Sequence, residues 1–118
     1  MLFRFRNFRV YKDAQQFRKE IYNLSRKFPK EELFVLTSQI RRAVLSICLN
    51  IAEGSNRKSD VDFARFLNNS LGSLEEVVAC LDVALDEKYI TKDEFGSYFH
   101  KAEMLGKQLL SFSKRLKT

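Results

Sequence analysis

Residues 36–57 carry apolar side chains on two sides of one expected helix. At about 100° per residue, one broad face collects Leu36, Ile40, Ala43, Val44, Ile47, Cys48 and Ile51. A smaller apolar patch lies nearly opposite and consists of Leu45, Leu49 and Ala52. Because a helix in a small monomer needs one buried face, we expect this helix to contact something beyond its own bundle.

A polar ridge runs between the two apolar faces and consists of Gln39, Arg42, Ser46, Asn50 and Glu53. One interpretation is a contact line to RNA or to a protein. The other, which the apolar flanking positions favour, is a hydrogen-bond network between subunits that fixes their register. Arg41 falls inside the apolar sector, where we expect it to pair with a carboxylate of another helix, for which Glu75 and Glu76 are candidates.

Apolar residues spaced three and four apart predict a first helix over residues 10–28, which Pro29 ends. The second helix is expected from Glu31 or Glu32 to Glu53. Gly54 then supplies a suitable C-terminal stop, because glycine tolerates the left-handed conformation common there.

Capping patterns mark the starts of two more helices. Ser59 precedes the third, and Thr91 with Glu94 forms a capping box before the fourth. The connections are short, which makes successive helices antiparallel neighbours. We therefore expect an all-α fold, an antiparallel up-down-up-down four-helix bundle, in a single domain over residues 1–118.

Small residues line the back of the third expected helix, at Gly72, Ala79 and Val83. A glycine inside a helix costs about 1 kcal/mol relative to alanine, so its presence favours close approach of another helix over a tolerated glycine on a solvated face. Together with the second apolar patch of residues 45–52, this line predicts a homo-oligomer.

Residue types needed for catalysis or metal binding do not converge in the sequence. His100 is the only histidine, and the two cysteines, Cys48 and Cys80, lack CxxC spacing. We expect free buried thiols, which suit the cytoplasm, and neither an enzyme, a metal site nor a cofactor. The basic N-terminus has no apolar region after it, and we expect no membrane span.

Charge is distributed unevenly along the chain, whose net charge is +6. Residues 1–30 carry nine Lys/Arg against two Asp/Glu, a net +7, and residues 60–94 carry three against nine, a net −6. Residues 95–118 return to +4. A cationic surface for a polyanion, nucleic acid first, is one interpretation, and complementarity between neighbouring helices or subunits is the other.

A basic N-terminal arm over residues 1–9 interleaves phenylalanines with arginines. Its phenylalanines either stack on unpaired bases or, as we favour, pin the arm to the bundle or to a neighbouring subunit. Guanidinium groups pair well with phosphates. The candidate phosphate-binding residues of the chain are Arg4, Arg6, Arg9, Lys12, Arg18, Lys19, Arg57 and Lys58, with Arg41 and Arg42 as further candidates.

The block LTSQIRRAVLSICLNIAEGSNR, preceded by FP and EEL and followed by DF, FL and GSLEE, resembles a known family. These are the bacterial four-helix-bundle proteins first recognised as products of intervening sequences in 23S ribosomal RNA genes. The resemblance implies ring-like homopentamers related to accessory variability proteins of diversity-generating retroelements, which work with RNA and a reverse transcriptase. It makes signature positions of Gln39, Arg41, Arg42, Ala43, Ser46, Asn50, Ala52, Glu53, Gly54 and Arg57.

The sequence therefore favours a non-catalytic, oligomeric helical bundle that binds RNA or a ribonucleoprotein through a basic surface. The alternative is a protein-interaction scaffold without a nucleic-acid role. In that case the basic arm would dock on an acidic neighbour, such as residues 75–94 of an adjacent subunit.

Overall fold

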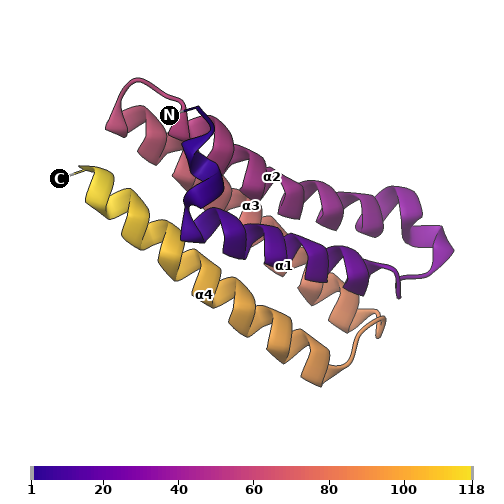
Figure 1. The fold of residues 1–118 in the computed structure, drawn as a ribbon. Coiled ribbons are helices and arrows are strands. Elements are labelled where there is room, and N and C mark those ends of the chain that lie inside the picture. The colour runs from indigo at the N-terminus through magenta and orange to yellow at the C-terminus, as the bar shows by residue number, and fades with distance from the viewer. Residues whose placement is uncertain (1, 118) are drawn as a thin grey trace.

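The computed structural model describes residues 2–117, and all its regular structure is helical (Figure 1). The four α-helices are α1 (Arg9–Ser25), α2 (Ser38–Ser55), α3 (Asp60–Asp86) and α4 (Lys92–Lys117). Each helix packs against the next, and α1 also contacts α4, so the four helices surround one core. The expected all-α fold with four helices is confirmed.

One buried stripe on each helix forms the core. The broad apolar face expected for residues 36–51 lies in it, and none of its seven residues is more than 6% exposed. Burying a side chain as large as leucine stabilises a fold by about 1.5–3 kcal/mol, which is why such stripes dictate how helices face one another. Both cysteines are free and buried, as predicted, and burial raises the pKa of each thiol to about 11.

The segment before α2 differs from the continuous helix that we expected. Lys30–Glu32 forms a 3-10 helix, η2, and Leu33–Thr37 forms a π-helical turn, η3, whose amide at Leu36 donates to the Glu32 carboxylate at 3.3 Å. The turn brings Leu36 into the core and leaves Leu33, Phe34 and Val35 exposed by 48%, 89% and 65%. Turns of this type are rare and are frequent at functional sites.

Gly54 does not end α2, which continues to Ser55, so its predicted role as a helix stop is wrong. Gly54 is instead buried beneath the start of α3. A Cβ atom at this position would lie 2.7 Å from Cβ of Phe66 and 2.9 Å from Cδ1 of Phe63. Glycine is required here because α2 and α3 approach closely.

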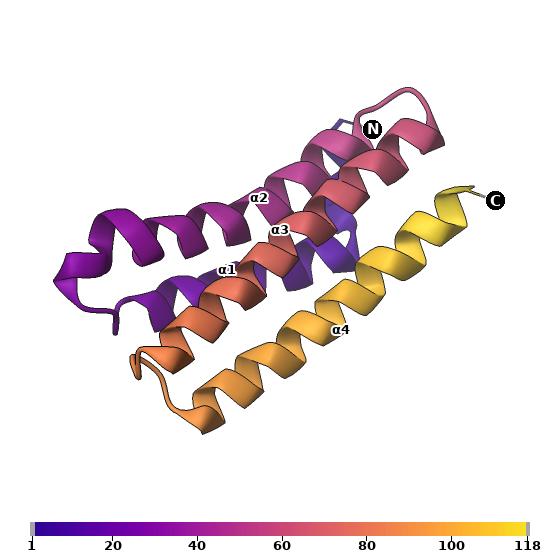
Figure 2. The same cartoon turned by 180° about the vertical axis from the view of Figure 1, so that it is seen from behind.

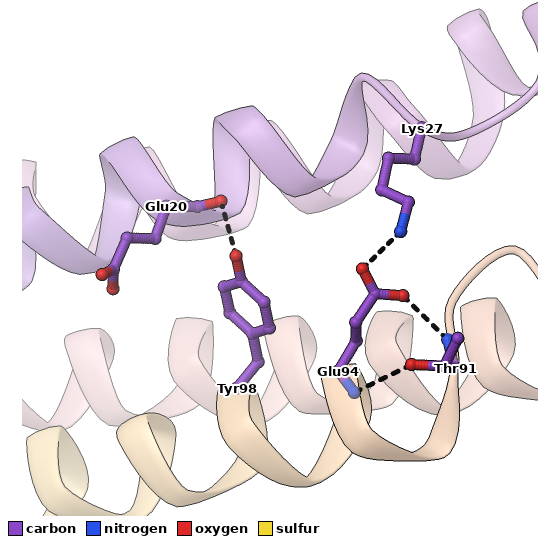
Figure 3. A network of polar contacts seen from close by, with 5 residues as sticks. All are labelled: Glu20, Lys27, Thr91, Glu94 and Tyr98. Carbon is purple, nitrogen blue, oxygen red and sulfur yellow. Dashed lines mark hydrogen bonds and ion pairs between the residues drawn. The ribbon is translucent and has the colours of Figure 1, made fainter.

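Both predicted helix caps are confirmed. The Ser59 hydroxyl accepts from the amide of Asp62 at 3.1 Å. At the start of α4, the Thr91 amide donates to Glu94 Oε1 at 2.9 Å, and the Glu94 amide donates to Thr91 Oγ1 at 3.1 Å (Figure 3). These bonds satisfy amides that the helix itself leaves without acceptors.

Polar contacts join α4 to α1 and to Lys27, which lies just after α1. Glu94 bonds the Lys27 ammonium, and the Tyr98 hydroxyl donates to the Glu20 carbonyl at 3.4 Å (Figure 3). Further along, Lys101 bonds Glu20 at 3.1 Å and Gln108 bonds Asp13 at 2.8 Å. As the residue number rises along α4, the residue number of the partner near α1 therefore falls. Both termini accordingly lie at the end of the bundle where α2 passes into α3 (Figure 1).

Candidate functional surfaces

The predicted N-terminal arm is folded against the bundle. Arg4–Asn7 forms a 3-10 helix, η1, that contacts α1 and α2. The Phe8 ring lies 5.4 Å from that of Phe112 and 6.2 Å from that of Phe63, centroid to centroid. This aromatic contact pins the segment to the bundle, whereas Leu2 and Phe3 remain 80% and 66% exposed.

Arg4 bonds the C-terminal end of α2. Its Nε and Nη2 atoms donate to the Ser55 carbonyl at 3.1 and 3.0 Å, and its guanidinium lies 5.7 Å from the centroid of the Phe63 ring. A cation bonded to a terminal carbonyl complements the negative end of a helix dipole. Arg4, predicted as a phosphate ligand, therefore already has partners within its own chain.

The other predicted phosphate ligands fall into two groups. Arg9 lies 3.5 Å from Asp13 with its side chain 88% exposed, Arg18 donates to Gln15, and Arg57 donates to the Glu53 carbonyl. The remaining side chains are exposed and have no hydrogen bond or ion pair within residues 2–117; they are Arg6, Lys12, Lys19 and Lys58. Arg6 lies in η1, Lys12 and Lys19 lie seven residues apart on α1, and Lys58 lies between α2 and α3.

A cationic groove of about 410 Å³ lies between the start of α1 and the second half of α4, and we define it by Arg9, Lys107 and Arg115. Phe8, Met104 and Phe112 are among its other lining residues. The part of the chain that the structure describes contributes no carboxylate to this lining. Sequence reasoning singled out only Arg9. The net charge of +4 over residues 95–118 could have identified the other two cations, because the expected bundle places the fourth helix beside the first.

Large apolar side chains are exposed on α2 and η3, and we define the outer face of α2 and η3 by Leu33, Phe34, Val35, Leu45 and Leu49. Leu45 and Leu49 are 37% and 51% exposed, so the second apolar patch lies outside the core of the single chain. Isolated apolar side chains are normal on protein surfaces, whereas a contiguous apolar patch is typical of an interaction site.

By length and composition alone, the segment Lys30–Ser55 could cross a membrane, contrary to what we expected from the sequence. Its 18-residue window has a mean hydropathy of 1.2, and 44% of that window is buried in the bundle. This is weak evidence for a membrane span, because core helices of soluble proteins pass the same test.

The polar ridge joins α2 to α3 within one chain, where we expected contacts between subunits. The Asn50 amide donates to the Ser46 carbonyl at 2.9 Å, and the Ser73 hydroxyl of α3 donates to that of Ser46, also at 2.9 Å. Gln39 bonds Glu76 of α3. The ridge has these partners because it faces α3, whereas Arg42 and Glu53 at its edge are exposed.

Arg41 contacts α1, and its expected pairing with Glu75 or Glu76 is wrong. Its Nε donates to the Ser25 hydroxyl at 2.8 Å, and its guanidinium lies 5.7 Å from the centroid of the Tyr22 ring. The reason is the rotation of α2 about its axis, which turns this position toward α1.

Gly72 is exposed, and a Cβ atom there would meet no atom within 4 Å. No helix of the same chain therefore approaches Gly72, and the predicted close approach of a helix from another subunit stays a prediction. Ala79 and Val83 on the same line are exposed as well. The small-residue line faces outward.

Comparison with known proteins identifies relatives over most of the chain. The family model of the 23S rRNA-intervening sequence protein matches residues 6–111. A crystal structure from Bacteroides thetaiotaomicron, described as a protein of unknown function from the S23 ribosomal protein family, is 30% identical, with a TM-score of 0.81. The match covers 89% of this chain and 95% of that one. The search of curated proteins gives no match. The extent of the family match shows that this chain belongs to the 23S rRNA-intervening sequence protein family.

Proposed function

We propose that this protein is a non-catalytic, self-associating helical bundle that binds RNA through the cationic groove. The observation that carries the proposal is the convergence of Arg9, Lys107 and Arg115 from two helices that are far apart in the sequence. Phosphate groups are bound by such clusters of guanidinium and ammonium groups.

Two further features of the groove support binding of a polyanion. The N-terminus of α1 lies in it, and its N-cap, Phe8, offers no side-chain acceptor to the first amides. The positive end of the helix dipole therefore adds to the charge of the arginines and the lysine. Phe8 and Phe112 are partly exposed beside these cations, and aromatic rings of this kind can stack on unpaired bases.

The finer architecture that we propose is an antiparallel up-down-up-down bundle assembled into a ring-like homo-oligomer. The reversed order of the contacts between α1 and α4 supports the first part. The outer face of α2 and η3 supports the second, because contact with another copy would remove Phe34, Leu45 and Leu49 from water.

RNA binding is tested on the full chain with single-stranded and structured RNA across a salt series. Binding through phosphates weakens with salt, with a slope of about 0.7 per contact on a single strand. A triple charge reversal, Arg9→Glu with Lys107→Glu and Arg115→Glu, is expected to abolish binding while circular dichroism shows an unchanged helix content.

The matched control reverses three exposed cations at the opposite end of the bundle, Arg26, Lys30 and Lys92. It changes the net charge by the same amount, so it separates a specific groove from general attraction. Equal loss of binding in both variants would overturn the assignment to the groove. No binding by the unaltered chain at low salt would instead favour the scaffold without a nucleic-acid role.

Self-association is tested by light scattering at physiological salt. Leu49→Glu on the outer face of α2 is expected to lower the mass toward that of the monomer. Leu110→Glu on α4 is the matched control, because Leu110 is 49% exposed and Leu49 is 51% exposed. A monomeric mass for the unaltered chain would end the self-association proposal, and recruitment to lipid vesicles would assign the face to a membrane.

A further inference from the structure

A second groove, of about 370 Å³, lies between α3 and α4, which run side by side (Figure 2). Its floor is apolar and includes Leu74 and Val78 of α3 with Phe99 and Ala102 of α4. Gly106 also lines it, and a Cβ atom there would lie 3.3 Å from Cδ2 of Leu74. The groove is therefore bounded closely by packed apolar groups.

Carboxylates form the rim of this groove. Glu75 and Asp82 of α3 and Glu103 of α4 are exposed, and none has a hydrogen bond or ion pair within the described residues. No lysine or arginine of the described chain lines the groove. Such a surface suits a segment in which apolar side chains alternate with cationic ones, because the apolar groups fill the floor and the cations meet the rim.

The N-terminal segment of this chain has that chemistry. Residues 2–6 read LFRFR. Leu2 and Phe3 are large exposed apolar groups, and Arg6 is an exposed cation whose side chain has no hydrogen bond or ion pair within the described residues. Phe3 has a φ of 60°, in the left-handed region that a bulky residue rarely adopts. A contact that lets the backbone of such a residue leave this conformation releases the free energy of the strain.

The segment cannot reach the groove of its own chain. Arg4 is bonded to Ser55 at the end where α2 passes into α3, and the two residues before Arg4 span at most about 7 Å. Leu74 lies 14 residues beyond the start of α3 at Asp60, which is about 21 Å along the helix at 1.5 Å per residue. The occupant must come from another molecule.

We propose that Leu2 and Phe3 of one copy dock in the α3–α4 groove of a second copy, with Arg6 facing the acidic rim. The inference rests on the self-association proposed above and adds a second pair of contacting surfaces to the outer face of α2. Because the two surfaces differ, an open assembly leaves one segment unused at one end and one groove unused at the other, and a closed ring uses all of them.

Disulfide cross-linking between two full-length variants tests the contact. A tagged chain carrying Leu2→Cys is refolded together with an untagged chain carrying Ala79→Cys, and the mixed dimer is measured after mild oxidation. The native cysteines are buried and add little background, which the unaltered chain measures. The control partner carries Ser97→Cys, an exposed position of α4 outside the groove lining.

Docking raises the local concentration of the two thiols, so we expect the Ala79→Cys partner to give at least about ten-fold more mixed dimer than the control partner. Arg6→Glu in the first chain is expected to lower that yield, and Glu103→Lys in its partner to restore it. Equal cross-linking of both partners, in a sample whose mass is still oligomeric, overturns this contact and leaves self-association standing. A monomeric mass overturns both.

Discussion

Replacing Gly54 by alanine tests whether the close approach of α2 and α3 shapes the bundle. The added methyl group would meet two atoms of α3 at less than 3.0 Å, Cβ of Phe66 and Cδ1 of Phe63. The Phe63 ring can turn slightly, but Cβ of Phe66 is attached directly to the backbone. Relief at Phe66 therefore requires a shift of α3 itself.

Two opposing effects set the size of the change. Overpacking in a dense core costs about 1–3 kcal/mol. Alanine is favoured over glycine inside a helix by about 1 kcal/mol, and Gly54 lies near the helix end, where this gain is smaller. We expect a net loss of about 1–2 kcal/mol in the free energy of unfolding, and a fall in Tm of about 3–8 °C for a chain of this size.

Thermal and urea unfolding followed by circular dichroism measure this change, at one fixed protein concentration because association would shift Tm. Gly96→Ala is the control, since Gly96 is exposed in α4 and an added Cβ would meet nothing within 4 Å. That variant is expected to gain about 0.5–1 kcal/mol from helix propensity alone. If Gly54→Ala were as stable as the control, the argument from close approach would be refuted.

Three further outcomes are expected. Arg4→Ala should lower stability by about 1–3 kcal/mol in urea unfolding, because two charged hydrogen bonds to Ser55 are lost, and an unchanged midpoint would contradict this. The Lys27 ammonium and the Thr91 amide lower the pKa of Glu94. The contribution of Glu94 to stability is therefore present above its ordinary pKa of 4.5 and is lost as pH falls through the lowered value. Glu94→Gln should weaken the dependence of the free energy of unfolding on pH in this acid range, measured by unfolding at a series of pH values. Both cysteines should react slowly with a thiol reagent at pH 8 and rapidly in denaturant, because their thiol pKa is about 11 and they are buried; fast native labelling would contradict their placement in the core.

The two proposed contacts use charges of opposite sign on different sides of the bundle. The cationic groove gathers Arg9, Lys107 and Arg115, and the α3–α4 groove carries carboxylates at Glu75 and Glu103. RNA would be repelled by the second groove and attracted by the first. Self-association through the outer face of α2 and the α3–α4 groove would therefore leave the cationic groove accessible to a nucleic acid.

Local chemistry along the chain determined the four helices of this protein and their buried sides. The spacing of Ile40, Val44 and Ile47 alone predicts which face of their helix is buried, because the helical repeat places these residues on one side. Caps at Ser59 and Thr91 are equally local, since a cap needs only the three residues that follow it.

The tertiary structure alone decided features that depend on which helices are neighbours and how each is rotated. Gly54 has a different role from the one that the sequence predicted, because Phe66, which lies close to it, belongs to another helix. Arg41 meets Ser25 for the same reason. The cationic groove brings Arg9 together with residues about a hundred positions later in the chain. Only the packing of α1 on α4 places these side chains near one another, and no local sequence pattern encodes that packing.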